Sequence, residues 1–193
     1  MLETTEDINQ LIMEDDWMMN ILKTAQKLNL PDWWICAGFI RSKIWDQLHG
    51  FQVRTPLADI DVIYFDPNNP EKHKEREFEK KLIDMAPSIP WSVKNQARMH
   101  LLSGFSPYSS SVEGIAKFPE TVTALGAKLD EEGNVVFVAP WGIEDVLQME
   151  VRPTSYYATE KKGVYEKRIA SKNWQAKWPK LKIFNADGIL LNV

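Results

Sequence analysis

The sequence predicts an α+β fold, in which a small mixed sheet is flanked by helices. Short apolar runs alternate with amphipathic segments through the N-terminal half, in the order strand, helix, strand, helix, strand. The composition is globular, with 44% hydrophobic and 26% charged residues. The 193 residues suit one domain, which we divide into an N-terminal helix over 5–30, a core over 31–105 and an extension of the same domain over 112–181.

The first elements follow from apolar spacing. Apolar residues recur at helical intervals over 5–28 and predict one amphipathic helix, which Pro31 helps to end. An apolar run over 33–39 predicts a buried strand. Apolar residues then repeat every four positions over 40–48, so this segment is expected to be helical, with Gly50 as its C-terminal cap.

The middle of the chain continues the alternation. β-Branched and aromatic residues over 59–66 predict a second strand. The charged segment over 71–85 carries one apolar stripe and is expected to form an exposed helix. A third strand is expected to begin over 91–93 and a helix to follow over 95–102. The serine-rich stretch over 106–111 is the clearest loop and a candidate domain seam.

The second half is less regular. We expect a helix over 112–118, a strand over 134–139 and a short helix over 142–148. The charged segment over 161–177 is expected to be a terminal helix with a solvated basic face, or else a face that binds an RNA acceptor. Two tryptophans four residues apart near its end favour packing over base stacking.

Composition and charge exclude several classes of function. Lys plus Arg is 23 and Asp plus Glu is 27, so the formal net charge is −4, which argues against a protein that coats DNA. A single cysteine excludes an intramolecular disulfide and a cysteine-cluster zinc site. No apolar run is long enough to cross a bilayer, and the acidic N-terminus lacks the apolar stretch of a secretory signal. We therefore expect a cytoplasmic protein with no membrane partner.

Two carboxylates spaced for one face of a strand are the sharpest chemical feature. In the predicted strand, Asp59 and Asp61 lie at positions i and i+2 and share a face. Like charges at that distance repel unless water or a cation compensates them. Mg²⁺ binds carboxylate oxygens and leaves positions open for phosphate oxygens, so the pair is a candidate metal and catalytic site. The alternative is a pair of solvated carboxylates at a strand end.

A candidate phosphate site lies one element earlier. Gly38 stands at the predicted strand-to-helix turn and permits close backbone approach to a ligand. The N-terminus of the following helix favours phosphate, and Arg41 and Ser42 add a charged fork and a hydroxyl there. A phosphate site followed by a metal-binding carboxylate pair is what nucleotidyl transfer from an NTP requires. The alternative is an ordinary turn with a surface arginine.

Four further residues are candidates for nucleotide binding. Asn95 and Arg98 share one side of the predicted helix over 95–102 and could face the triphosphate or the acceptor. The alternative is that they tie the strands together. Thr121 and Thr123 alternate, so in an extended segment both hydroxyls line one face, where they bind a base or ribose or else cap the local backbone.

Motifs spread over 32–181 carry a family resemblance. They are Gly38…Arg41, Trp45-Asp46, Asp59-x-Asp61, Tyr64-Phe65-Asp66, Asn95-Gln96-Ala97-Arg98-Met99-His100, Phe118-Pro119-Glu120-Thr121-x-Thr123, Gly142-Ile143-Glu144-Asp145, Val151-Arg152-Pro153 and Arg168…Trp174…Trp178-Pro179-x-Leu181. With these motifs the sequence resembles the nucleotidyltransferase-like family of small bacterial proteins, within the polymerase-β-type nucleotidyltransferase superfamily. The run over 95–100 is the most specific, because six such residues in succession rarely recur by chance.

The resemblance implies a nucleotidyltransferase fold, with Gly38 at the turn of the glycine motif and Asp59 and Asp61 as the metal ligands. The chain departs from the superfamily pattern in two places. Gly38 is followed by Phe39, where the superfamily usually has serine or glycine. The strand expected near 91–95 lacks the third carboxylate that the superfamily often has on the strand after the metal ligands.

Two functions are compatible with these motifs. The first is a Mg²⁺-dependent nucleotidyltransferase that moves an NMP group from an NTP to an unknown acceptor, which is a small molecule, a protein or an RNA. The second is a catalytically degenerate protein of the same fold that binds a nucleotide or a protein partner, and the missing third carboxylate favours it. Glu120 or Asp145 could supply that carboxylate from the second half of the chain, but spacing alone assigns neither.

Overall fold

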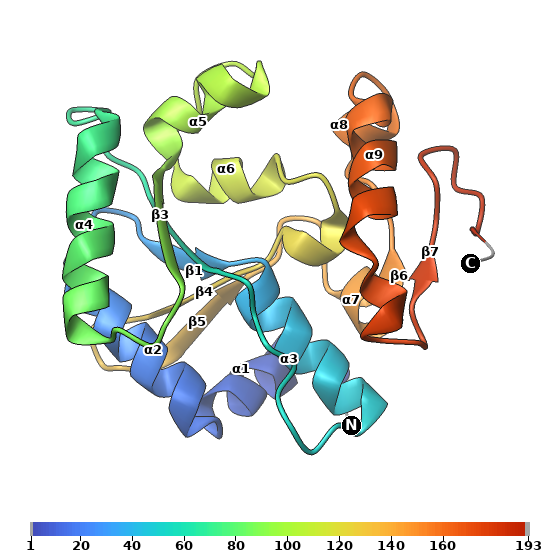
Figure 1. Cartoon of the computed structure of the whole chain (residues 1–193), viewed down its shortest axis with the longest axis horizontal. Helices are drawn as coiled ribbons and strands as arrows, with labels where there is room; N and C mark the ends of the chain where they lie inside the picture. The colour runs from blue at the N-terminus through green and yellow to red at the C-terminus, as the bar shows by residue number, and fades with distance from the viewer. Residues whose placement is uncertain (1, 192–193) are drawn as a thin grey trace.

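A five-stranded mixed sheet forms the centre of the protein in a computed structural model that describes residues 2–191 (Figure 1). Its strand order is β3-β2-β1-β4-β5, and β6 and β7 form a second, two-stranded sheet. The predicted fold class is therefore confirmed. The strands are β1 (Trp34–Cys36), β2 (Ile60–Tyr64), β3 (Trp91–Asn95), β4 (Gly126–Leu129), β5 (Val135–Val138), β6 (Glu150–Val151) and β7 (Lys182–Ile183).

The helices flank the sheet. The C-terminal helices α8 and α9 lie at the side of the molecule away from α4 (Figure 1). No helix within residues 2–191 is long and apolar enough to span a bilayer. The helices are α1 (Thr5–Met13), α2 (Asp16–Gln26), α3 (Gly38–His49), α4 (Lys72–Met85), α5 (Gln96–Ser103), α6 (Ser111–Ala116), α7 (Glu144–Leu147), α8 (Ser155–Ala158) and α9 (Lys162–Lys172), with 3₁₀ turns η1 (Thr121–Thr123) and η2 (Trp174–Ala176).

The pairing of the strands explains the mixed character of the sheet. β1 runs antiparallel to both β2 and β4, β2 runs parallel to β3, and β4 and β5 form an antiparallel hairpin. Sequence periodicity did not predict β4, because its four residues, Gly-Ala-Lys-Leu, carry none of the β-branched or aromatic residues that favour strands.

Each face of the sheet packs against a different set of helices. Ile35 and Val62 belong to the main core with α1 and α2, whereas Trp34 and Ile63 pack on the other face with Ile115 of α6. Because Asp61 lies two residues before Ile63, it is on the α6 face of β2.

The N-terminal segment forms two helices, so the prediction of a single helix is wrong. Asp15 interrupts the segment, because its carboxylate accepts a hydrogen bond from the backbone N–H of Met18 at 3.0 Å and caps α2. The same carboxylate pairs with Lys43 at 2.7 Å and with Arg54 at 2.6 Å. These contacts fix a turn that the apolar periodicity across both helices conceals.

The C-terminal segment docks on α3 through tryptophans. The ring of Trp45 lies 6.0 Å from that of Trp174 and 5.1 Å from that of Trp178, both edge to face. The indole N–H of Trp178 donates to the Asp46 carboxylate at 2.8 Å. The predicted terminal helix ends at Lys172, before either tryptophan of this segment, and both are buried by packing.

The serine-rich loop is tied to the sheet. The Ser111 hydroxyl donates to the backbone carbonyl of Asp32 at 2.5 Å, and the Ser111 N–H donates to the Asp32 carboxylate at 2.6 Å. Contacts therefore join the loop to the residues just before β1, which is the opposite of what a domain seam shows.

Candidate functional site

A cavity of about 370 Å³ lies where the start of α3, the start of β2 and the end of α9 meet. Five sequence-predicted residues from the first half of the chain line it together, and Thr123 joins them from η1. The lining residues are Ala37, Gly38, Arg41, Ser42, Pro56, Leu57, Ala58, Asp59, Asp61, Thr123, Arg168, Ser171, Lys172, Trp174, Lys177 and Trp178. Six predicted site residues therefore meet in this cavity: Gly38, Arg41, Ser42, Asp59, Asp61 and Thr123.

The two aspartates enter the cavity from the start of β2. Asp59 precedes the strand and is exposed, whereas Asp61 lies in the strand between two fully buried residues, Ile60 and Val62. Burial raises the pKa of the Asp61 carboxyl, the charge of Asp59 raises that pKa further, and a hydrogen bond with the Ser92 side chain opposes both effects. A cation between the two carboxylates would relieve both costs.

We predict that Asp61→Asn stabilises the protein in the presence of a chelator. A carboxyl with a raised folded-state pKa destabilises the fold wherever it is ionised, so removing its charge raises the unfolding midpoint at neutral pH. This gain should disappear as the pH falls below the ordinary aspartate pKa, where the wild-type carboxyl is protonated in both states. Thermal unfolding at both pH values tests this, with the exposed Asp84→Asn as control. A midpoint that falls in Asp61→Asn contradicts the prediction.

The turn into α3 holds an unusual backbone conformation. Ala37 has φ 54° and ψ −114°, a region that residues other than glycine rarely adopt. The positive φ thus falls on Ala37, although the sequence led us to expect the special role at Gly38. A Cβ on Gly38 would lie 3.6 Å from Nη2 of Arg41, which is ordinary contact. The strained turn sets the direction in which the first residues of α3 face the cavity.

Arg41 is a buried cation without a carboxylate partner among the described residues. It is 8% exposed, its Nη2 donates to the Ser42 hydroxyl at 3.3 Å, and its Nε has no hydrogen-bond partner. Its guanidinium carbon lies 4.9 Å from the ring centroids of both Trp45 and Trp174 and 5.5 Å from that of Trp178.

Burial makes the charged form of Arg41 less stable than it would be in water. Burial lowers the pKa of its guanidinium to about 10, the Glu120 charge opposes this effect, and the Arg168 charge adds to it. The group remains protonated at neutral pH. A buried, charged guanidinium that lines a cavity and has no carboxylate partner among residues 2–191 is suited to bind an anion.

A buried carboxylate positions two more groups at the cavity. Glu120 is fully buried and accepts hydrogen bonds from Nε of Arg168 at 2.5 Å and from the Thr123 hydroxyl at 2.7 Å. Glu120 is therefore committed to an internal ion pair. Sequence reasoning missed Arg168 and Lys172 as site residues, although their spacing of four on a helix places both on one face.

Asn95 and Arg98 lie outside this cavity. The Asn95 side chain is fully buried, where it accepts from the N–H groups of Asp66 and Ala97 and donates to the carbonyls of Asp66 and Asn69. Arg98 donates to both carboxylate oxygens of Glu75, at 2.7 and 2.5 Å. Both side chains hold α4, β3 and α5 together, and a nucleotide contact for either stays a prediction.

Breaking this internal network is expected to cost stability. Glu75 is 3% exposed and also accepts from the Asn95 N–H at 2.8 Å, so Glu75→Ala removes the acceptor of that buried N–H and of two N–H groups of the part-buried Arg98. We expect a loss of about 3 kcal/mol in the free energy of unfolding. Urea denaturation measures the loss, and Glu77→Ala on the exposed face of the same helix should stay within about 0.5 kcal/mol of wild type. Equal losses in the two variants would contradict the role assigned to Glu75.

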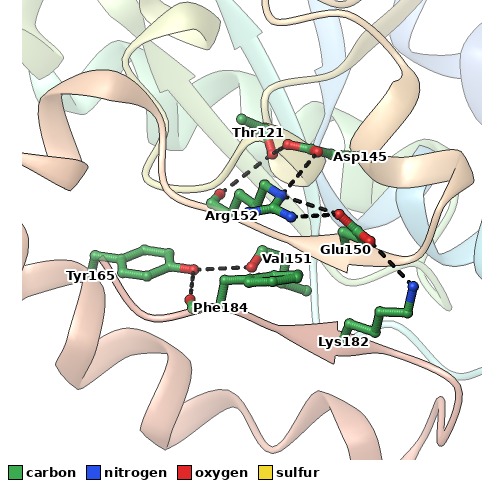
Figure 2. A network of polar contacts seen from close by, with 8 residues as sticks. All are labelled: Thr121, Asp145, Glu150, Val151, Arg152, Tyr165, Lys182 and Phe184. Carbon is green, nitrogen blue, oxygen red and sulfur yellow. Dashed lines mark hydrogen bonds and ion pairs between the residues drawn. The ribbon is translucent and has the colours of Figure 1, made fainter. Parts of the chain in front are cut away.

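Thr121 and Thr123 face different groups, because they lie in a 3₁₀ turn and not in the extended segment that we expected. The Thr121 hydroxyl donates to the Asp145 carboxylate at 2.6 Å (Figure 2), and Thr121 is not among the residues that line the cavity. Arg152 joins that carboxylate to Glu150, which also pairs with Lys182 on β7. The network in Figure 2 links Thr121, Asp145, Glu150, Arg152 and Lys182, and beside it Tyr165 donates to the carbonyls of Val151 and Phe184.

The two carboxylates that the sequence offered as a third metal ligand are both paired with arginines. Glu120 pairs with Arg168, and Asp145 lies in the Arg152 network. Within residues 2–191, no group of three or more His, Cys, Asp or Glu side chains is arranged to hold a metal ion. Asp59 and Asp61 are the two carboxylate side chains that line the cavity, and their role as metal ligands stays a prediction.

Comparisons with known proteins agree with this architecture. A family model described as nucleotidyltransferase matches residues 23–183. Among solved structures, one protein whose NMR structure reveals a CCA-adding enzyme head domain is 36% identical, with a TM-score of 0.85. The match covers 94% of this chain and 96% of that chain.

Longer enzymes share the fold at low identity. A CCA-adding enzyme in complex with CTP is 12% identical with a TM-score of 0.59, and the match covers 91% of this chain and 43% of that chain. A tRNA nucleotidyltransferase complexed with a primer tRNA and an incoming ATP analog is 15% identical with a TM-score of 0.53, covering 86% of this chain and 47% of that one. The chain thus spans less than half the length of these enzymes. No curated protein matches it.

Proposed function

The chain belongs to the nucleotidyltransferase family, and on that premise we propose that it transfers an NMP group from an NTP to an acceptor hydroxyl in a Mg²⁺-dependent reaction. The single observation that carries the proposal is that one cavity brings Asp59 and Asp61 together with the buried guanidinium of Arg41, which has no carboxylate partner among residues 2–191. A paired carboxylate site binds a cation, and a buried arginine binds an anion, so the cavity fits a metal-bound triphosphate.

The donor set of the carboxylate pair fits a hard divalent cation. Asp59 and Asp61 offer only oxygen ligand atoms, and burial, followed by the charge of Asp59, raises the pKa of the Asp61 carboxyl, which supports a cation at this pair. When bound, Mg²⁺ neutralises charge on the triphosphate and makes the acceptor hydroxyl easier to deprotonate.

The remaining residues orient the NTP. Arg41, with Arg168 and Lys172 across the cavity, binds the β- and γ-phosphates, and the first turn of α3 contributes backbone N–H groups. A lone pair on the acceptor oxygen forms the bond to the α-phosphorus. The bond from that phosphorus to the bridging oxygen breaks, its electrons leave on pyrophosphate, and the hydroxyl proton passes to solvent.

One observation favours a second function. Because both candidates for a third carboxylate are paired with arginines, the cavity could bind an NTP without turnover. In that case the protein is a nucleotide-binding or partner-binding member of the family.

Label transfer distinguishes the two functions. The protein is incubated with Mg²⁺ and with each NTP, labelled either at the α-phosphate or at the γ-phosphate. Sugars, nucleosides and hydroxyl amino acids are offered as acceptors, and water is the acceptor when none of them reacts. We expect α-label on an acceptor and an equal amount of γ-label in pyrophosphate. Release of γ-label as orthophosphate, or no product from either label, would contradict nucleotidyl transfer.

A further inference from the structure

A second cavity of about 260 Å³ is also lined by Asp61. Among residues 2–191, Asp61 is the one residue that lines both this cavity and the first. The second cavity lies on the α6 face of the sheet, where α5 and α6 lie between α4 and α8 (Figure 1). Its position beside one of the two proposed metal ligands makes it part of the reaction site.

The walls of the second cavity are mostly apolar and aromatic. Tyr108 and Tyr157 are 7% and 6% exposed, and Met99 and Phe118 complete the apolar surface. The centroid of the Tyr108 ring lies 6.3 Å from that of the Phe105 ring, so Phe105, which does not line the cavity, packs against Tyr108. Such a surface suits a small molecule with a planar apolar body.

Two lysines give this cavity a positive charge. Lys94 and Lys117 both line it, and neither has a carboxylate within 4.0 Å among residues 2–191. Lys94 lies on the same face of β3 as Ser92, whose strand partner is Asp61. The Lys94 ammonium donates to the backbone carbonyl of Val93 at 3.1 Å, and that of Lys117 lies 5.4 Å from the Phe105 ring centroid. Among residues 2–191, neither ammonium is therefore neutralised by a carboxylate in direct contact.

The stereochemistry of phosphoryl displacement assigns the second cavity its role. In an in-line displacement the attacking oxygen approaches the α-phosphorus from the side opposite the leaving pyrophosphate. The cationic first cavity, with Arg41 and Arg168, suits the pyrophosphate half. The acceptor must then approach from beyond the carboxylate pair, where the second cavity meets Asp61.

We propose that the second cavity binds the acceptor and that the acceptor is a small molecule with a planar apolar body, an anionic group held by Lys94 and Lys117, and a hydroxyl directed at Asp61. This rests on the proposed function. The cavity volume and the acidic charge of the chain, −4, favour a small molecule over RNA, because RNA binding needs an extended basic surface.

A titration with phenyl phosphate tests the proposal without knowledge of the natural acceptor. Mg²⁺ and inorganic pyrophosphate first saturate the cationic cavity, and their binding is measured by calorimetry. Phenyl phosphate, which combines a planar ring with a dianion, is then added, and its dissociation constant is compared with those of benzoate and of neutral phenol. We expect both anions to bind more tightly than phenol, and the two anions distinguish a phosphate from a carboxylate preference.

Matched lysine variants locate the binding. Lys117→Gln and Lys94→Gln should each weaken phenyl phosphate binding about tenfold or more, the loss of one charge-assisted contact, and leave Mg²⁺-pyrophosphate binding unchanged. Lys128→Gln is the control, because Lys128 lies over the Trp34 ring at 4.3 Å, much as Lys117 lies over Phe105, but outside the cavity. It should leave both affinities unchanged.

Three results would overturn the proposal. The first is equal phenyl phosphate affinity in Lys117→Gln, Lys94→Gln and Lys128→Gln. The second is displacement of phenyl phosphate by a short single-stranded RNA at lower concentration than phenyl phosphate itself requires, which would assign the site to RNA. The third is lysine-dependent phenyl phosphate binding by a protein that binds no Mg²⁺-pyrophosphate, which would refute the proposed function and the acceptor role together while leaving an anion site.

Discussion

Asp59→Asn is expected to lower nucleotidyl transfer about a thousandfold or more. Asparagine keeps the size of the side chain but removes one of the two charges that we propose hold the metal, and the metal supplies several kcal/mol of transition-state stabilisation. Asp59 precedes β2 and is exposed, so the substitution removes no buried contact. The rate of α-label transfer from the NTP measures the effect.

Asp66→Asn is the matched control for this variant. Asp66 follows the same strand, and its carboxylate accepts from the N–H groups of Asn68 and Asn69 in a loop away from the cavity. Asparagine retains an oxygen for these bonds, so Asp66→Asn should transfer label at nearly the wild-type rate. If Asp59→Asn transferred label as fast as Asp66→Asn, the carboxylate pair would not be the metal site.

Arg41→Met is expected to weaken NTP binding about ten- to a hundredfold without unfolding the protein. The variant loses charge-assisted hydrogen bonds to phosphate, each of which contributes about 1.5–3 kcal/mol. The pKa of Arg41 is lowered to about 10, so its charged form is held at a cost in the folded state at every pH below that value. Removing the charge therefore keeps or raises the unfolding midpoint of the unliganded protein, and methionine still packs among the three tryptophans.

Arg54→Met separates phosphate binding from stacking. Arg54 also lies over a tryptophan, with its guanidinium carbon 4.1 Å from the Trp17 ring centroid, but it pairs with Asp15 and does not line the cavity. Calorimetry should give Arg54→Met the wild-type NTP affinity. Equal affinity of Arg41→Met and wild type would show that the triphosphate does not reach Arg41.

Local sequence pattern was sufficient to predict the site residues that come from the first half of the chain. Asp59 and Asp61 were identified because the period of a strand places them on one face, and Gly38, Arg41 and Ser42 because a helix N-terminus follows a strand. These inferences need only local geometry. The structure brings all five residues to one cavity.

The other half depends on contacts that span the chain. Arg168 reaches the cavity because Glu120, 48 positions earlier, holds its guanidinium. Arg168 belongs to the last motif of the family resemblance, but its charge and helical position alone do not distinguish it from the other cations of a charged helix. Conversely, Asn95 and Arg98 lie in the most specific motif of the family resemblance, yet their side chains hold neighbouring elements together. Residue type in a motif did not reveal whether the role was chemical or structural.

Short elements and turns account for the errors in the fold. The single N-terminal helix was predicted because apolar spacing continues across Asp15, whose capping and ion pairs end one helix and start the next. The facing hydroxyls of Thr121 and Thr123 were predicted from alternation, which holds for strands and fails in a 3₁₀ turn.

Calorimetric titration with each of the four NTPs and Mg²⁺ tests the central claim most directly, because it needs no acceptor. The titration compares wild type with the Asp59→Asn/Asp61→Asn variant, each with Mg²⁺ and with chelator. We predict that the wild type binds at least one NTP in a Mg²⁺-dependent manner and that the variant loses this dependence. No NTP binding by the wild type, or the same Mg²⁺-dependent binding by both proteins, would contradict a nucleotide site at these carboxylates.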